Sequence, residues 1–191
     1  MKLATYDAGD GPRAGVVLGD SILDLSAASG GALPSSVREL LAQEGALANA
    51  RALLGDPPEG CTVPFEEARL LAPIPRPGRV AALGGNYREH CEESGADVPT
   101  EPVIFSKAPT SVIGPGDAIV LPEASGKVDY EVELAFVIGR RAKLVPAEEA
   151  MACVAGYTVL CDVSARDYQM EKPGRQWYLA KSFDTFCPMG P

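Results

Sequence analysis

The sequence predicts an α+β fold in which strands and short helices are mixed along the chain. Strand-like runs with alternating apolar residues, such as residues 128–139 (VDYEVELAFVIG), recur between turn signals. Helical patterns are few, and most of them are short. There are no internal repeats and no low-complexity tracts. Mixed elements of this kind are typical of an α+β domain.

Residues 1–72 are expected to form a small N-terminal α+β module. A helix is predicted over residues 35–55, because Ser36 and Glu39 have the spacing of a capping box and Val37 begins an apolar stripe. Gly45 is a point where this helix can break in two. The strand-like runs of the module are residues 2–6, 13–19 and 21–26.

Residues 73–78 are expected to be a proline-rich linker, because prolines keep the chain extended and pack poorly. The second part of the chain, residues 79–191, carries the motifs that point to chemistry. Within it, residues 145–156 are predicted to be a helix with Pro146 in its first turn. Strands are predicted at residues 80–83, 102–107, 118–122, 128–139 and 157–165.

Charge and composition limit the kinds of partner and the location that we expect for the protein. The formal net charge is −9, and an acidic surface repels phosphate backbones, so no nucleic acid partner is expected. Five cysteines without a CxxC pair are a poor disulfide framework, which favours a reducing compartment. No membrane association is expected, because no long apolar run or signal-like segment occurs. The expected location is cytoplasmic.

Two glutamates share one face of the strand predicted at residues 128–139. Side chains alternate along a strand, so Glu131 and Glu133 lie side by side and their like charges repel. Two carboxylates so placed suit a hard divalent cation, which prefers oxygen ligands. A solvated acidic face on an edge strand is the alternative. Asp129 is expected to lie at the solvent end of the strand, outside this pair.

A third acid and the single histidine favour a functional site. Asp162 ends an apolar run where a strand is predicted to meet a helix, a position that suits a site residue or a helix cap. His90 and Glu93 are one helical turn apart, so the glutamate can orient the imidazole and raise its basicity. A polar surface helix could carry the same pair. Gly84 and Gly85, just before, allow a ligand to approach the backbone closely.

Five segments, in this order and spacing, resemble the fumarylacetoacetate hydrolase family, in particular its smaller bacterial and organellar members of the acylpyruvase and domain-containing type. The resemblance covers roughly residues 79–191 and implies that this part is the catalytic domain. It also implies a mixed β-sandwich roll as the fold, and a homodimer. The segments are GGNYREHCEESG, EPVIFSK, VDYEVELAFVIG, GYTVLCDVSARDYQ and AKSFDTFCPMGP.

The resemblance implies a role for each matching residue. Glu131, Glu133 and Asp162 match three carboxylates that hold one divalent ion, Mg²⁺ or Mn²⁺. His90 and Glu93 match a dyad that activates water. Lys181 matches a lysine that contacts the substrate and the developing charge. Substrate contacts are implied for Tyr87, Lys107, Arg166 and Gln169.

These roles imply a metal-dependent hydrolase that cleaves the carbon–carbon bond of acylpyruvate-like 2,4-diketo acids through an enolate that the metal stabilises. The expected ligand is a small anionic keto acid. The same site also suits an oxaloacetate decarboxylase or tautomerase, or a 2-oxo-heptenedioate isomerase. A further alternative is an inactive metal-binding remnant. Family members continue through further strands with a GD…TGTP-like stretch, so the catalytic domain is expected to be incomplete at its C-terminus.

Overall fold

The computed structural model describes residues 1–191, and the first part of the chain folds around one antiparallel sheet with the strand order β4-β3-β2-β1-β5. The turn between β2 and β3 is tight, because Leu18 pairs with Ser21. Gly19, in this turn, adopts a φ of 56°, which glycine tolerates without strain. The strands are β1 (Leu3–Asp7), β2 (Pro12–Leu18), β3 (Ser21–Asp24), β4 (Thr62–Pro64) and β5 (Arg69–Leu71).

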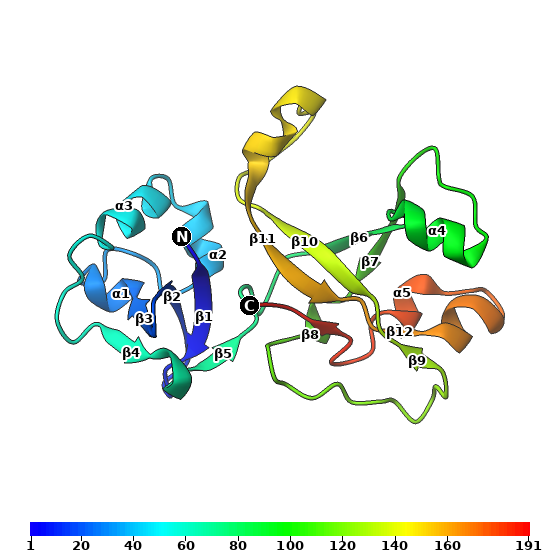
Figure 1. Cartoon of the computed structure of the whole chain (residues 1–191), viewed down its shortest axis with the longest axis horizontal. Coiled ribbons are helices and arrows are strands. Elements are labelled where there is room, and N and C mark those ends of the chain that lie inside the picture. The colour runs from blue at the N-terminus through cyan, green and yellow to red at the C-terminus, as the bar shows by residue number, and fades with distance from the viewer.

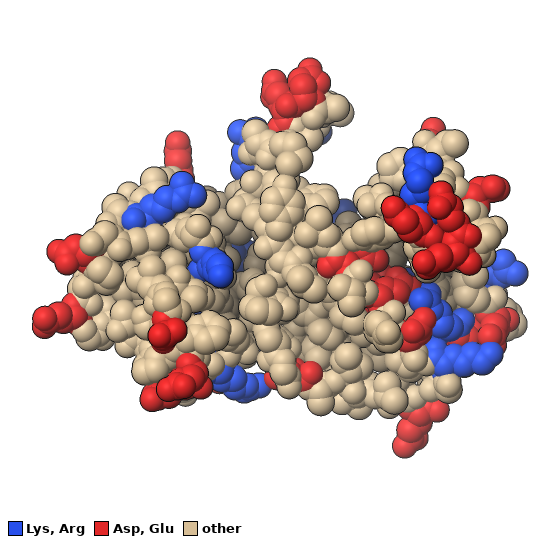
Figure 2. All heavy atoms as spheres, in the orientation of Figure 1, with Lys and Arg blue, Asp and Glu red and all other residues tan.

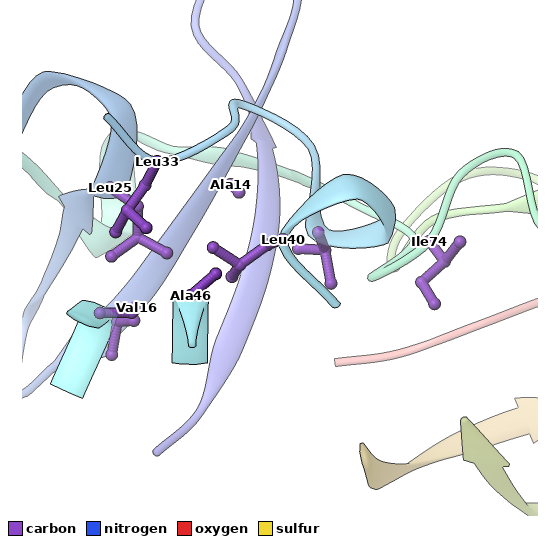
Figure 3. Close-up of a cluster of buried hydrophobic side chains, with 9 residues drawn as sticks. Ala14, Val16, Leu25, Leu33, Leu40, Ala46 and Ile74 are labelled. Carbon is purple, nitrogen blue, oxygen red and sulfur yellow. The ribbon is translucent and has the colours of Figure 1, made fainter. Parts of the chain in front are cut away.

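Short helices pack on this sheet and enclose the main apolar core. The nitrogen of Glu39 donates to the Ser36 side chain, as the capping-box spacing predicts. The predicted long helix breaks at Gly45, whose φ is 74°. The core contains Ala14, Val16, Leu25, Leu33, Leu40, Ala46 and Ile74 (Figure 3). The helices are α1 (Leu25–Ala28), α2 (Val37–Ala42), α3 (Ala46–Ala52) and the 3-10 turn η1 (Phe65–Glu67).

The second part of the chain contains two-stranded sheets and short helices, which confirms the predicted α+β class. The antiparallel pairs are β6–β7, β10–β11 and β9–β12, and β8–β13 is parallel. The strands are β6 (Val80–Gly84), β7 (Val103–Lys107), β8 (Val112–Ile113), β9 (Val128–Asp129), β10 (Val132–Ile138), β11 (Val154–Cys161), β12 (Ser164–Ala165) and β13 (Cys187–Pro188). The helical elements are α4 (Arg88–Ser94), η2 (Pro109–Ser111), η3 (Ala147–Cys153), the π-helical turn η4 (Asp167–Glu171) and α5 (Trp177–Ala180).

The strand predicted at residues 128–139 is interrupted where the site forms. β9 ends at Asp129, β10 begins at Val132, and Glu131 lies in the gap. The carbonyl oxygen of Glu131 accepts a hydrogen bond of 2.8 Å from the nitrogen of Asp162, which lies in the corresponding gap between β11 and β12. Because β10 pairs with β11 and β9 pairs with β12, the two gaps face each other. The pairing thus brings the two acids together.

One predicted strand is wrong. Residues 118–122 form no strand, since the nitrogen of Val120 donates to the Thr185 side chain at 2.8 Å instead of to a neighbouring strand. The short helix predicted over residues 145–156 is confirmed over Ala147–Cys153, with Pro146 directly before it. The nitrogen of Glu149 bonds the carbonyl of Pro146, three residues back, which makes the segment a 3-10 helix, and β11 already begins at Val154.

Strand β10 presents two different faces, as the alternation predicts. The face that carries Glu133, Ala135 and Val137 is half-buried. Figure 1 shows β10 and β11 in the middle of the molecule, and Figure 2 shows that this middle band carries few charged side chains. The residues of the opposite face of β10, each more than half exposed, are Val132, Leu134, Phe136 and Ile138.

The proline-rich segment connects the two parts of the chain, and residues at its start pack against each of them. Ile74 belongs to the apolar core of the first part, whereas Ala72 packs with Val80 and Leu160 of the second. The division into module, linker and catalytic domain stays a prediction. The five cysteines have free thiols, and none of the helices is long and apolar enough to cross a membrane.

Candidate active site

The side chain of Lys181 lies at the centre of a buried polar cluster. Lys181 directly follows α5, and 1% of its side chain is exposed. Its ammonium donates to Oδ2 of Asp162 and Oγ of Ser164, each at 2.7 Å, and lies 3.2 Å from both carboxylate oxygens of Glu131. These contacts use all three donor hydrogens of the ammonium. Two carboxylates therefore compensate its charge where water is excluded.

A second lysine binds the other oxygen of Asp162. Lys107, the last residue of β7, places its Nζ 2.6 Å from Oδ1 of Asp162. The same nitrogen donates to the carbonyl oxygens of Val163 and Lys181. Burial lowers the pKa of Lys107, and the charge of Asp162 opposes this shift. Asp162 thus lies between two lysines.

Arg166 closes the cluster on its more exposed side. Its Nη1 lies 2.6 Å from Oε1 of Glu131 and donates to Oε1 of Gln169 at 2.8 Å. Its Nε and Nη2 donate to Oδ2 of Asp129 at 3.0 and 2.9 Å. Arg166 is therefore a second cation on Glu131, beside Lys181, and it also bonds the buried side chain of Gln169.

Glu133, two residues after Glu131, lies in β10 and lines the cavity beside the cluster. Burial raises the pKa of Glu133, the hydrogen bond from Tyr87 opposes this shift, and the charges of Glu131 and Asp162 add to it. The Tyr87 hydroxyl also accepts a hydrogen bond of 3.1 Å from the nitrogen of Leu134. Tyr87 therefore connects the start of α4 to β10 next to Glu133.

His90 and Glu93 lie away from this cluster. Both are exposed on α4, a helix at the edge of the molecule beyond β6 and β7 (Figure 1). They form no hydrogen bond or ion pair with each other, and neither lines the cavity at Glu133. The structure does not bring the predicted water-activating pair to the acids.

A cavity of about 600 Å³ gives a small molecule access to the polar cluster. Lys107, Glu133 and Asp162 contribute to its wall, and most of the remaining lining is apolar and comes from β6, β10 and β11. Cavities of this size, with a few convergent polar groups in an apolar wall, are typical ligand sites. The cluster therefore lies where a substrate can reach it.

The acids of the cluster have the donor chemistry that a hard divalent ion prefers. Glu131, Glu133 and Asp162 offer only carboxylate oxygens, and the charges of two of them act on the pKa of the third. No three histidine, cysteine, aspartate or glutamate side chains are grouped as ligands of one ion, and the Lys181 ammonium lies between Glu131 and Asp162. The assignment of three carboxylates to one metal ion stays a prediction. The structure brings two of them, Glu131 and Asp162, into contact with the ammonium of Lys181.

Two members of the cluster were not predicted. Ser164 is fully buried and accepts a hydrogen bond from Lys181, and Asp129 pairs with Arg166 while remaining half-exposed. The same signal could have found both. Ser164 comes two residues after Asp162, and Asp129 comes two residues before Glu131, so each pair projects to one side of an extended segment.

Residues 79–191 match the family model described as fumarylacetoacetate (FAA) hydrolase C-terminal. A mitochondrial oxaloacetate tautomerase of Homo sapiens is 48% identical over 197 residues, which cover 100% of this chain and 62% of the relative. A mitochondrial oxaloacetate tautomerase of Bos taurus is 46% identical with the same coverage. The chain thus spans less than two thirds of the length of these curated relatives.

Solved structures of related proteins share the fold. The maleylpyruvate hydrolase of Sphingobium sp. SYK-6, in complex with manganese(II) and pyruvate, is 32% identical with a TM-score of 0.77, covering 100% of this chain and 66% of that one. The 5-carboxymethyl-2-hydroxymuconate delta-isomerase of Mycobacterium smegmatis is 36% identical with a TM-score of 0.75, covering 100% and 65%. These similarities confirm the fold that the sequence motifs implied.

Proposed function

The chain belongs to the fumarylacetoacetate hydrolase family, and from this premise we propose that it catalyses the enol–keto tautomerisation of oxaloacetate or a closely related 2-oxo dicarboxylic acid. The relatives with 46–48% identity over the whole chain are named for this reaction. Their names support tautomerisation more strongly than the carbon–carbon bond hydrolysis that the sequence first suggested. Because the chain spans 62% of these relatives, the activity of the whole protein is part of the proposal.

Tautomerisation moves one proton between a carbon and an oxygen of the substrate by way of an enolate. It requires a base near the carbon, an acid near the oxygen and positive charge beside the enolate oxygen. It does not require an attacking water. Within one cluster, the carboxylates of Glu131 and Asp162 can serve as the base, and the ammonium of Lys181 can serve as the acid and as the positive charge.

The observation that carries the proposal is the position of Lys181 between Glu131 and Asp162, of which Asp162 lines the cavity. His90 neither lines the cavity nor contacts this cluster. A fixed ammonium in a site that excludes water stabilises a developing negative charge more than it would in solvent. A substrate oxygen that enters beside Asp162 can take the place of one of its present acceptors. Hydrolysis would also need a residue that activates water.

We further propose that Glu131, Glu133 and Asp162 hold one divalent ion, Mg²⁺ or Mn²⁺. When bound, such an ion supplies a Lewis acid that polarises the substrate carbonyl and favours its enolate. The charge of the cluster supports this proposal, because its four carboxylates exceed its three cationic side chains. The manganese in the related maleylpyruvate hydrolase supports it as well. The carboxylates are Asp129, Glu131, Glu133 and Asp162, and the cations are Lys107, Arg166 and Lys181.

Hydrolysis of 2,4-diketo acids is the second candidate. His90 and Glu93 are separated by one turn of α4, the spacing of an acid that orients an imidazole. The structural similarity to a maleylpyruvate hydrolase also favours this reaction. It would require α4 to carry His90 to the cavity, and Tyr87 at the start of α4 already contacts β10.

Product analysis separates the two candidates. The purified protein is incubated with Mg²⁺ and either enol-oxaloacetate or acetylpyruvate. We expect faster loss of the enol absorbance of oxaloacetate than in buffer, without release of pyruvate. Formation of pyruvate and acetate from acetylpyruvate would instead identify the hydrolase. Pyruvate and carbon dioxide from oxaloacetate would identify a decarboxylase.

The partners, the oligomeric state and the location of the protein are also proposals. The ligand is a small anionic keto acid, and the protein is a homodimer that binds neither nucleic acid nor membranes. The net charge of −9 supports the absence of a nucleic acid partner. A cytoplasmic location is the composition-based proposal, and curated relatives are mitochondrial. Size-exclusion chromatography with light scattering measures the molar mass of the protein and so tests whether it is a dimer.

A further inference from the structure

The side chain of Lys107 is completely buried beside the cavity, and its bonding capacity is used up. Its exposed fraction is 0%. Its Nζ donates to Oδ1 of Asp162 at 2.6 Å, to the carbonyl of Val163 at 3.2 Å and to the carbonyl of Lys181 at 2.5 Å. An ammonium has three donors, and two of the three acceptors here are backbone carbonyls. A substrate oxygen could bond Lys107 only by leaving one of these buried groups unpaired, whereas the acceptors of Lys181 are all side chains. This contrasts with the substrate contact that the family resemblance implied.

The three acceptors of Lys107 belong to the two residues on which the site depends. Oδ2 of Asp162 accepts from the Lys181 ammonium at 2.7 Å, while Oδ1 of the same carboxylate accepts from Lys107. The bond to the Lys181 carbonyl fixes the backbone from which the Lys181 side chain starts. Lys107 therefore holds Lys181 at its backbone and, through Asp162, at its charged end.

Neighbouring contacts show that β7 acts as a support for Lys181. Phe105, two residues before Lys107 in β7, places its ring centroid 4.9 Å from the Lys181 ammonium. Trp177 of α5 packs edge-on against the same ring at 5.4 Å. The backbone nitrogen of Ala108, just after β7, donates a hydrogen bond of 2.9 Å to the side-chain oxygen of Ser182. The end of β7 thus contacts the chain around Lys181 at several points.

We propose that Lys107 is a positioning residue that orients Asp162 and Lys181 for the reaction and does not touch the substrate. The kinetic part of this inference rests on the proposed tautomerase function. Side chains that orient the groups of a site typically change activity by about 10- to 100-fold when removed. Substrate affinity should change little, because no substrate contact is lost.

The kinetic test compares Lys107→Met, which keeps the length and removes the ammonium, with wild type. We expect kcat for oxaloacetate tautomerisation to fall about 10- to 100-fold with little change in KM. A higher KM at unchanged kcat would overturn the proposal, as would no change in either. Lys127→Met is the matched control, because Lys127 forms an exposed ion pair with Glu171.

A labelling test on the wild-type protein needs neither turnover nor a folded variant. Lysines are acetylated with acetic anhydride and quantified by mass spectrometry, with and without oxalate as a probe of the anionic ligand. We expect Lys107 to resist labelling in both samples while Lys127 reacts. The proposal would be overturned if Lys107 were labelled as fast as Lys127 in the absence of oxalate and were protected when oxalate is present. That result would identify Lys107 as a ligand contact. If wild type does not accelerate tautomerisation, the proposed function fails while labelling still decides the burial of Lys107.

Discussion

The carboxylate of Asp162 and the ammonium of Lys181 lie 2.7 Å apart, and both side chains are almost completely buried. A buried ion pair is tolerated only when its remaining donors and acceptors are satisfied. Here Lys107 satisfies the second oxygen of Asp162, and Ser164 and Glu131 satisfy the other donors of Lys181. The pair is therefore part of a connected hydrogen-bond network, and a substitution at one member changes the contacts of the others.

Glu131→Gln should weaken the binding of a divalent ion. The change removes one negative charge and one strong oxygen ligand, so we expect the affinity for Mn²⁺ to fall by at least about tenfold. Titration calorimetry of the purified protein with Mn²⁺ measures the affinity. Glu171→Gln is the matched control, because Glu171 lies in an exposed ion pair away from the cluster. Unchanged Mn²⁺ affinity in Glu131→Gln would show that this residue is not a ligand.

Asp24 should matter more for stability than its hydrogen-bond partner Tyr6. The Tyr6 hydroxyl donates to Oδ2 of Asp24 at 2.7 Å, and Oδ1 of Asp24 accepts from the nitrogen of Ala27 as the cap of α1. Tyr6→Phe removes one buried hydrogen bond and should cost about 1 kcal/mol. Asp24→Ala also removes the cap and leaves the Tyr6 hydroxyl unpaired, which together cost about 2–4 kcal/mol. Urea unfolding followed by circular dichroism compares them, and equal losses would contradict this assignment.

Glu133 should make the stability of the metal-free protein depend on pH. Burial raises the pKa of Glu133 in the folded state, so folding favours the protonated carboxyl. Its favourable contribution is fully present below the unfolded pKa and is lost as the pH rises through the folded pKa. Glu133→Gln should therefore be more stable than wild type at about pH 7 and equal to it at about pH 4. Urea unfolding in EDTA at both pH values measures this, and a stabilising effect confined to the lower pH would contradict the sign.

The sequence predicted the α+β class, the alternating faces of the strand that carries Glu133, and the capped helix that begins after Ser36. Those features follow from local periodicity and capping patterns. The breaks at Glu131 and Asp162 could not be predicted, because they depend on the pairing of β9 with β12, whose residues are distant in the sequence. The strand expected at residues 118–122 is wrong for a related reason, since an apolar run forms a strand only where a partner strand exists. The bonds of Lys107 likewise depend on three separate segments meeting.

The most direct test of the central claim compares two substitutions in one assay. The claim is that enol–keto conversion depends on the Lys181 cluster and not on the histidine of α4. The rate of enol-oxaloacetate loss is measured with Mg²⁺ for wild type, Lys181→Met and His90→Ala, with circular dichroism to confirm that each is folded. We expect Lys181→Met to lower kcat roughly 100- to 1,000-fold, because it removes the charge beside the enolate, and His90→Ala to remain close to wild type. Loss of activity in His90→Ala with full activity in Lys181→Met would contradict the claim.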